Sequence, residues 1–408
     1  MYLAAIVLVG CKGDSSRGKS QRIIPQKMRI LHINGMTPVK NQGRGSACWA
    51  YAMLAAIETT HISMGDSVNL SPAWAVRALM EDAYVRNVMT KGADRGSARG
   101  MGMTLLNIIR KDGIVPYDSY PDREGRGAPT GIILNKTRLI AEKAVNSRRG
   151  PKVYQKTLDD MLDDSMGHRP RNVYMYSAQY TPMEFAHSVC REDEYIGIAS
   201  CTHHPFGEWF VMETADNWER NSFYNMKIEE MMAIVEKAVR EGKGVCWEGD
   251  ISEEGFSFRK GIADLDLPKG KDVQQERQRG IESYKTTDDH CMAIVGLARN
   301  ASGKTYFIMK NSWGTDNPYG GLMYMSEDYM RMKTIAVILP WQKNNELSTT
   351  QPASRHVRNR SQRLDGHCLW GLSREECLGN TVWSTSRALL PVSGARRDGW
   401  WCARRRQW

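Results

Sequence analysis

The 408-residue chain has nine cysteines but no Cys-x-x-Cys pair. This absence gives no support to a zinc ribbon or a thioredoxin-like redox site, because both are built on such pairs. A long apolar run is also missing at the N-terminus, where only about nine apolar residues occur together, too few for a helix that crosses a bilayer of about 30 Å. We therefore expect neither a paired-cysteine site nor a membrane span there.

A strong charge of one sign is missing from most of the chain. The formal net charge is +10, but residues 341–408 hold twelve Lys and Arg against five Asp and Glu, so residues 1–340 carry only +3. The basic residues of this body are interspersed with acidic ones, and we do not expect the body to bind nucleic acid. With 41% apolar residues, the chain is long enough to bury a core of its own.

The first residues, MYLAAIVLVGCKGDSS, resemble a bacterial lipoprotein signal, although no Lys or Arg precedes the apolar stretch. Gly10 before Cys11 matches the small residue that permits cleavage in such signals. We expect residues 1–20 to be a signal and tether, Cys11 to carry a lipid anchor to a membrane, and the protein to be exported to the bacterial cell envelope, as a periplasmic or surface lipoprotein. The alternative is an ordinary first strand in a cytoplasmic protein.

Helical patterns come first in the body and strand patterns come last. Helices are predicted at CWAYAMLAAIETTHISMG, at a segment that Ser71 caps, at TLLNIIRKDG and at IEEMMAIVEKAVREGKG. Strands are predicted at GVCWEGD, CMAIVGLA, TYFIMKNS, GLMYMSE and KTIAVILP. This order favours an α+β fold with two lobes and a cleft between them.

We divide the chain accordingly. A single domain is expected over residues 21–341, with a helical lobe at about 42–135, an insertion at about 121–230 and a β lobe at about 230–341. Residues 342–408 are basic and rich in Trp and Arg, without a periodic apolar pattern, and we expect them to be poorly ordered. The alternative for this tail is a segment that binds nucleic acid or another anionic surface.

The most informative cysteine is Cys48, where the polar, glycine-rich NQGRGSA turns into an apolar helical run. At the N-terminus of a helix the backbone dipoles favour the thiolate, which is the nucleophilic form of cysteine. A nucleophilic site also needs a base, a group that orients the base and donors for an oxyanion. The sequence DDHCMAIVG places His290 at the entrance to a strand, and Asn311 follows the next strand in KNSWGT. Gln42 lies six residues before Cys48.

These segments resemble the papain-like cysteine peptidases, which carry Gln, Cys, His and Asn in this chain order and Trp after both Cys and Asn. The stretches LSPAWAVRALMEDAYVRNV, LLNIIRKDGIVPYDSYP, NWERNSFYN and NPYGGLMYMSEDYM look more like the bleomycin hydrolase and aminopeptidase C branch. The likeness covers roughly residues 36–340. It implies a papain-like two-lobed fold with a helical lobe, an antiparallel β-barrel-like lobe and the active site between them.

Carried over to this chain, the resemblance makes Cys48 the nucleophile, His290 its base, Asn311 the orienting group and Gln42 the oxyanion donor. Trp313 would shield the bond between the imidazole and the amide. The glycine-rich stretch that pairs with the substrate backbone in the family corresponds to Gly100 or Gly102.

The chain also departs from the papain pattern. Gly45 stands where papain-type members have a disulfide cysteine, the Gly-Ser before the nucleophile reads Ser46-Ala47, and the C-terminal WWCARRRQW matches nothing in the aminopeptidase branch. These departures leave open whether the enzyme acts as an endopeptidase or as an aminopeptidase.

The resemblance implies a cysteine peptidase that acts on peptide or protein substrates and needs no cofactor. The alternative is a non-catalytic, peptidase-shaped binding protein. The CTHH stretch at Cys201–His204 lacks a second ligand pair at suitable spacing, so we interpret it as a loop and predict no metal site.

Overall fold

The computed structural model describes residues 27–175 and 177–341. Cys11, the signal and tether at 1–20, and the tail at 342–408 lie outside the described residues. The lipid anchor, the export of the protein and the function of the tail therefore remain predictions, as does the division of the chain into domains.

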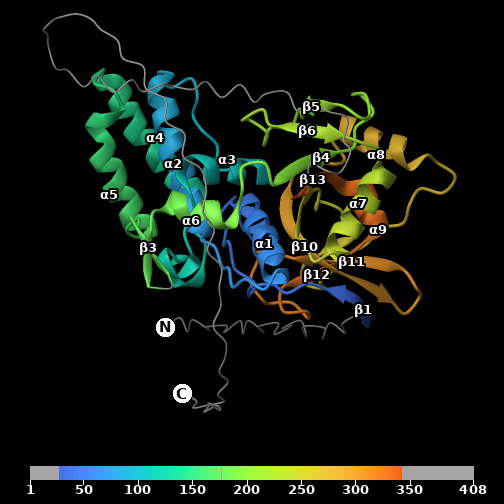
Figure 1. Ribbon diagram of the computed structural model, residues 1–408. Coiled ribbons are helices and arrows are strands. Elements are labelled where there is room, and N and C mark those ends of the chain that lie inside the picture. The colour runs from blue at the N-terminus through green and yellow to red at the C-terminus, as the bar shows by residue number, and fades with distance from the viewer. Residues whose placement is uncertain (1–26, 176, 342–408) are drawn as a thin grey trace, which may run out of the picture. The chain divides into compact units, whose positions relative to one another are not determined.

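Most of the helices lie on one side of the fold in Figure 1, together with the strand β3, and the strands of the large sheet lie on the other side with α1 between them. The α-helices are α1 (Cys48–Ser63), α2 (Pro72–Met89), α3 (Gly102–Asp112), α4 (Thr130–Ser147), α5 (Gln155–Met166), α6 (Pro182–Val189), α7 (Ile228–Arg240), α8 (Val273–Glu282) and α9 (Glu327–Lys333). Helices α7, α8 and α9 are the exceptions, because they lie beside the strands of the large sheet.

One large, mainly antiparallel sheet forms the second half of the fold. Its strands are β1 (Met28–Ile33), β4 (Tyr195–Ala199), β5 (Trp209–Val211), β6 (Ser222–Asn225), β7 (Val245–Gly249), β8 (Phe256–Ser257), β9 (Ile262–Ala263), β10 (His290–Asn300), β11 (Thr305–Lys310), β12 (Leu322–Ser326) and β13 (Thr334–Pro340). The strand order is β5-β6-β4-β13-β7-β10-β11-β12-β9-β8, and β1 pairs with β10. A separate hairpin joins β2 (Val173–Met175) to β3 (Ala178–Tyr180).

The predicted helices and strands are present. Ser71 caps α2 by accepting from the Trp74 backbone N–H, and Gly113 ends α3 with a positive φ of 74°. All five strands predicted in the last third belong to the sheet, as β7, β10, β11, β12 and β13. The structure thus has the α+β content that the order of patterns predicted.

Two parts of the sheet differ from the sequence prediction. Residues 195–225 fall in the predicted insertion, yet they supply β4, β5 and β6 to the main sheet. Strand β1 begins at Met28, just after the polar N-terminal stretch, and pairs antiparallel with the far end of β10. Both differences arise because pairing between segments far apart in sequence leaves no periodic signal within the segments themselves.

Helix α1 is buried from Trp49 to His61. It contacts the helical core on one side, and its Ala55 packs against residues of β10 and β11 such as Ala293 and Ile308 on the other. Because this helix is enclosed on all sides, its residues from Trp49 to Ile57 are apolar around the whole circumference. Ala47 and Trp49, on either side of Cys48, are both buried, which holds the Cys48 backbone in place.

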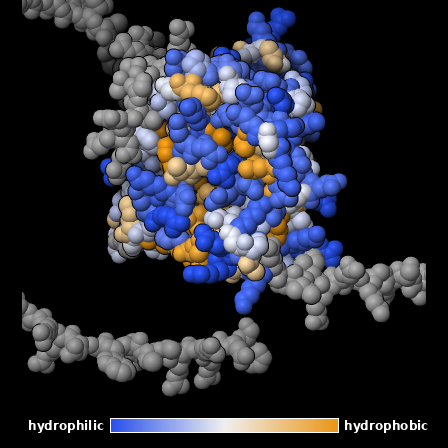
Figure 2. All heavy atoms as spheres, turned by 90° about the vertical axis from the view of Figure 1, so that its right-hand side faces the viewer, coloured by the Kyte–Doolittle hydropathy of each residue, from blue (hydrophilic) through white to orange (hydrophobic). Residues whose placement is uncertain are grey.

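The surface of the sheet half is largely hydrophilic. Figure 2 shows this face with hydrophobic side chains in separate small patches among hydrophilic ones. Among the residues that the structure describes, we find no helix with the length and apolar character needed to cross a membrane.

Candidate active site

A cleft of about 350 Å³ is lined by all but two of the catalytic and substrate-binding residues proposed from the sequence, the exceptions being Gly102 and Asn311. Its lining consists of Gln42, Gly43, Arg44, Gly45, Ser46, Cys48, Arg99, Gly100, Asp216, Ile251, Asp289, His290 and Trp313. These residues come from the loop before α1 and the start of α1, from the turn before α3, from the segments after β5, β7 and β11, and from the entrance to β10. The cleft is therefore shared by the helical half and the sheet half.

Cys48 is the first residue of α1 and is half-buried. The preceding residue, Ala47, has no side chain that could cap the helix, so no side-chain acceptor at this position satisfies the first backbone N–H groups. The positive end of the helix dipole therefore acts on Cys48. The Cys48 side chain is hydrogen-bonded to Cys291 and to His290. The hydrogen bond from Cys291 and the contact with His290 lower the Cys48 pKa well below its usual value, against the opposing effect of burial.

His290 and Asn311 are brought together by neighbouring antiparallel strands. His290 begins β10, Asn311 follows β11, and Ala293 pairs with Lys310 in the ladder. The His290 Nε2 and Asn311 Oδ1 atoms are 2.8 Å apart, and both residues are buried. The Asn311 oxygen accepts from His290 and also from the Ser312 N–H at 2.7 Å. Because Nε2 donates to Asn311, the imidazole presents Nδ1 to the cysteine.

Trp313 covers the imidazole. Its ring centroid lies 4.6 Å from that of His290, with 33° between the planes. Phe256 and Phe258 contact the other parts of the indole edge-on, with centroid distances of 6.1 and 5.3 Å. The aromatic rings thus cover His290, and the shielding of its hydrogen bond to Asn311 by Trp313 stays a prediction.

Gln42 is buried and is held by two polar contacts. Its Nε2 donates to the Gly45 carbonyl oxygen at 2.8 Å, and its Oε1 accepts from the Ser312 hydroxyl at 2.5 Å. The Gln42 backbone N–H donates to the Ser312 carbonyl oxygen at 2.7 Å. These contacts fix which end of the amide is the donor, and they link the loop before Cys48 to the segment that carries Asn311.

The two glycines proposed for substrate binding occupy different positions. Gly100 lines the cleft. Gly102 begins α3, and its N–H donates to the buried Glu248 carboxylate. A Cβ at Gly102 would lie 3.0 Å from Ile338 Cδ1 and 3.1 Å from Cys246 Sγ, so this glycine is needed for packing against β7 and β13. Of the two glycines, only Gly100 lines the cleft, and its role in substrate binding stays a prediction.

The sequence analysis missed Cys291, the residue after His290. In a strand, adjacent side chains point to opposite faces of the sheet, so the alternation gave no reason to expect that His290 and Cys291 would both contact Cys48. Cys291 is buried, and the hydrogen bond to Cys48, followed by burial, raises its pKa well above the usual value. Two thiols and an imidazole therefore share the environment of the nucleophile.

An ionic link that no sequence pattern predicted joins two residues of the cleft lining, Arg99 and Asp216. Arg99 Nε donates to both Asp216 carboxylate oxygens at 2.8 and 2.9 Å, and a terminal nitrogen of Arg99 donates to the Asp288 carbonyl oxygen at 2.5 Å. The Trp218 indole N–H donates to the Arg99 carbonyl oxygen at 2.9 Å. Because Asp288 lies two residues before His290, Arg99 fixes the approach to β10 against the turn that carries Gly100.

Comparisons with known proteins find sequence similarity to cysteine peptidases. The family model described as the Peptidase C1-like family matches residues 168–351. A mitochondrial cysteine proteinase 1 of Saccharomyces cerevisiae is 20% identical to this chain over 401 residues, covering 83% of the chain and 82% of the relative. Aminopeptidase C of Lactobacillus helveticus is 24% identical over 266 residues, covering 55% of this chain and 58% of the relative.

A solved structure supports the fold independently. The crystal structure of PepW from Lactobacillus rhamnosis HN001 aligns with a TM-score of 0.57 at 17% identity, covering 76% of this chain and 81% of the other. At this identity the similarity concerns the fold alone. The family model and the sequence relatives show that this chain is similar to the Peptidase C1-like family and to cysteine peptidases.

Proposed function

We propose that the chain hydrolyses peptide bonds with Cys48 as nucleophile, His290 as base and later acid, and Asn311 as the group that orients His290. The observation that carries the proposal is the 2.8 Å hydrogen bond between His290 Nε2 and Asn311 Oδ1, in a cleft that Cys48 and His290 line together. Gln42 completes the set as oxyanion donor, because its amide has a second N–H besides the one that Gly45 uses.

In the acylation step, the Cys48 thiolate attacks the carbonyl carbon of the scissile peptide, and a C–S bond forms. The negative charge moves to the carbonyl oxygen, where the Gln42 amide and the Cys48 backbone N–H stabilise it. His290 Nδ1 then gives its proton to the leaving nitrogen as the C–N bond breaks. The amine product leaves, and the acyl group remains on Cys48 as a thioester.

In the deacylation step, His290 removes a proton from water, and the resulting hydroxide attacks the thioester carbon. The C–S bond breaks, the carboxylic acid product leaves and the thiolate is restored. Asn311 keeps the imidazole oriented in both steps, since its oxygen accepts from Nε2 whether or not Nδ1 is protonated. Trp313 supports this role by covering the ring.

We test this mechanism with a thiol-directed epoxysuccinyl inhibitor and a peptide substrate at mildly acidic pH. The protein is expected to bind one inhibitor covalently at Cys48 and to lose its activity, and Cys48→Ala is expected to lose both labelling and hydrolysis. Cys190→Ala is the matched control, because burial raises the pKa of the Cys190 thiol to about 12 and keeps it unreactive. Hydrolysis that survives in Cys48→Ala overturns the mechanism, and an unlabelled Cys48 favours the non-catalytic binding protein.

A narrower proposal concerns specificity. We propose that the enzyme removes residues from the free N-terminus of peptides, which the names of two relatives support: aminopeptidase C of Lactobacillus helveticus and aminopeptidase W of Lactobacillus delbrueckii subsp. lactis.

Product mapping on a peptide library tests this specificity. Peptides with free N-termini are expected to lose one residue at a time, while N-acetylated copies of the same peptides are expected to stay intact. Cleavage of both sets at internal bonds would instead identify an endopeptidase, with the mechanism at Cys48 unaffected.

A further inference from the structure

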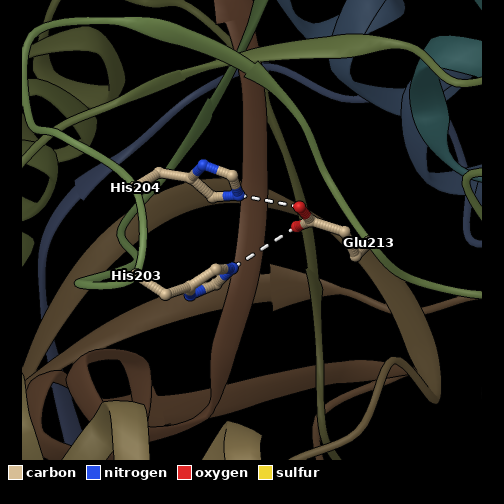
Figure 3. Close-up of side chains that lie close together, drawn as sticks. All are labelled: His203, His204 and Glu213. Carbon is tan, nitrogen blue, oxygen red and sulfur yellow. Dashed lines mark hydrogen bonds and ion pairs between the residues drawn. The ribbon is translucent and has the colours of Figure 1, made fainter.

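A second cluster of ligand-type side chains lies outside the catalytic set. His203 and His204 belong to the loop between β4 and β5, and Glu213 follows β5. The Glu213 carboxylate is 2.7 Å from His204 Nε2 and 3.4 Å from His203 Nε2. Figure 3 shows both imidazoles directed toward this carboxylate from the same loop. Sequence spacing could not predict the group, because its carboxylate lies nine residues beyond the paired histidines.

The chemistry of the three side chains fits one divalent ion. The two imidazole nitrogens and a carboxylate oxygen lie within 4.8 Å of one another, and an ion of the zinc class binds such ligands at about 2.0–2.2 Å. The positions of the three ligands therefore surround a volume that one ion can occupy after small movements of the side chains. Imidazole and carboxylate ligands favour zinc and its neighbours over calcium, which prefers oxygen ligands alone.

The loop that carries the histidines is fixed from behind by buried polar groups. The fully buried Asn225 donates through Nδ2 to the carbonyl oxygens of Cys201, His204 and Pro205, at 2.8 to 3.1 Å. The His204 ring stacks on Phe210 with a centroid distance of 4.4 Å. The backbone under the cluster is thus set before any ion arrives, which reduces the entropic cost of binding.

Gln278 determines which ring nitrogen of His203 carries the proton. Its Oε1 accepts from the Thr202 N–H, and its Nε2 donates to His203 Nδ1 at 2.8 Å. This arrangement places the ring proton of neutral His203 on Nε2, directed at Glu213, so His203 must move that proton before it can bind a metal. We therefore expect His204 and Glu213 to be the stronger ligands and His203 the weaker one.

We propose that His203, His204 and Glu213 form a surface site for a divalent ion of the zinc class, separate from the catalytic cleft. Three protein ligands leave further positions for water, as the exposure of the cluster allows. An ion there would fix Glu213 to the loop and so restrain the segment that leads to Asp216, the partner of Arg99 in the cleft.

The test is a titration of the Cys48→Ala protein with Zn²⁺ by isothermal calorimetry. This background is needed because Cys48 and His290 could themselves bind zinc, which would confuse any readout based on activity. We expect Glu213→Gln and His204→Gln each to weaken one binding event at least about tenfold, and His203→Gln to weaken it less. Ca²⁺ is expected not to bind at this site.

A matched control separates the site from nonspecific binding to exposed histidines. His168 is an exposed imidazole that contacts one carboxylate, Asp163, at 2.6 Å, and His168→Gln is expected to leave the titration unchanged. Residues beyond 341 contain further His and Cys, so the readout is the difference between variants of the full chain. Identical Zn²⁺ binding in the Glu213→Gln, His204→Gln and parent proteins would overturn the proposal.

Discussion

At the residue scale, a second thiol, that of Cys291, affects the reactivity of the proposed nucleophile Cys48. Cys291 makes the hydrogen bond that contributes most to lowering the Cys48 pKa, ahead of the contact with His290. The residue after the histidine thus affects the reactivity of a cysteine more than 240 positions away. A neutral donor suffices for this role, because the thiolate is an acceptor.

We predict that Cys291→Ala raises the pKa of Cys48. The loss of the hydrogen bond disfavours the thiolate, so the acidic limb of the rate of alkylation by iodoacetamide should move to higher pH. Cys201→Ala is the control, because this buried thiol follows β4 and does not line the catalytic cleft. An acidic limb that stays in place would show that His290 alone sets the reactivity of Cys48.

Gln42 gives a second prediction at this scale. Gln42→Ala removes one oxyanion donor, and such a loss typically lowers turnover by about 10²–10³-fold. The Cys48 thiolate does not depend on the amide, so the variant should still be labelled by the epoxysuccinyl inhibitor. Steady-state kinetics and mass spectrometry of the labelled protein check both parts, and wild-type turnover in the variant would contradict the assignment.

At the scale of elements, the loop before α1 is supported by the start of α4. The Ser46 N–H donates to Thr130 Oγ1 at 2.8 Å, and a Cβ at Gly45 would lie 2.7 Å from the Ala128 carbonyl oxygen. This contact gives a physical reason for glycine where papain-type sequences have cysteine, since a side chain at position 45 would displace the backbone before α4.

We predict that Gly45→Ala destabilises the protein by about 1–3 kcal/mol and lowers turnover, because overpacking moves the loop that carries Gln42 and Cys48. Gly131→Ala is the contrasting variant: it adds a methyl group with no neighbour within 4 Å, inside α4, and should stabilise by about 0.5–1 kcal/mol. Urea denaturation and kinetics measure both effects, and equal stability of the two variants would refute the argument.

At the scale of the whole molecule, a buried carboxyl group makes stability depend on pH. Glu248 is fully buried in β7, and its Oε2 has no hydrogen-bond partner. Burial, followed by the nearby Asp288, raises the Glu248 pKa well above 4.5. The folded state therefore keeps a proton that the unfolded chain has lost, so this group lowers stability as the pH rises above about 4.5 toward its folded pKa.

We predict that Glu248→Gln removes this dependence. The difference in unfolding free energy between the variant and the wild type should move in favour of the variant as the pH rises from 4.5 toward neutrality. Urea denaturation at a series of pH values measures this difference. The exposed Glu236, which pairs with Arg240, supplies the control, since Glu236→Gln should show no comparable trend. A flat difference for Glu248→Gln would argue that the carboxyl is ionised in the folded state.

Local patterns predicted much of the molecule. Local secondary structure was indicated by the apolar run from Cys48, by the cap at Ser71 and by the apolar strands that follow His290. These patterns are readable because burial and capping act on neighbouring residues. The positions of Gln42, Cys48, His290 and Asn311 were recognisable because the chain order and the flanking Trp residues resemble a known family. In the structure, Gln42, Cys48 and His290 line one cleft, and Asn311 is hydrogen-bonded to His290.

Other features depend on contacts that no local pattern encodes. The sequence alone determined where helices and strands form and which four residues were candidates for catalysis. Only the tertiary structure decided that Cys291 reaches Cys48, that Arg99 bonds to Asp216 across 117 positions and that Glu213 meets His203 and His204. The reason is physical: secondary structure follows from interactions within a few residues, whereas these contacts follow from strand order and register, which are fixed only when the whole core is packed.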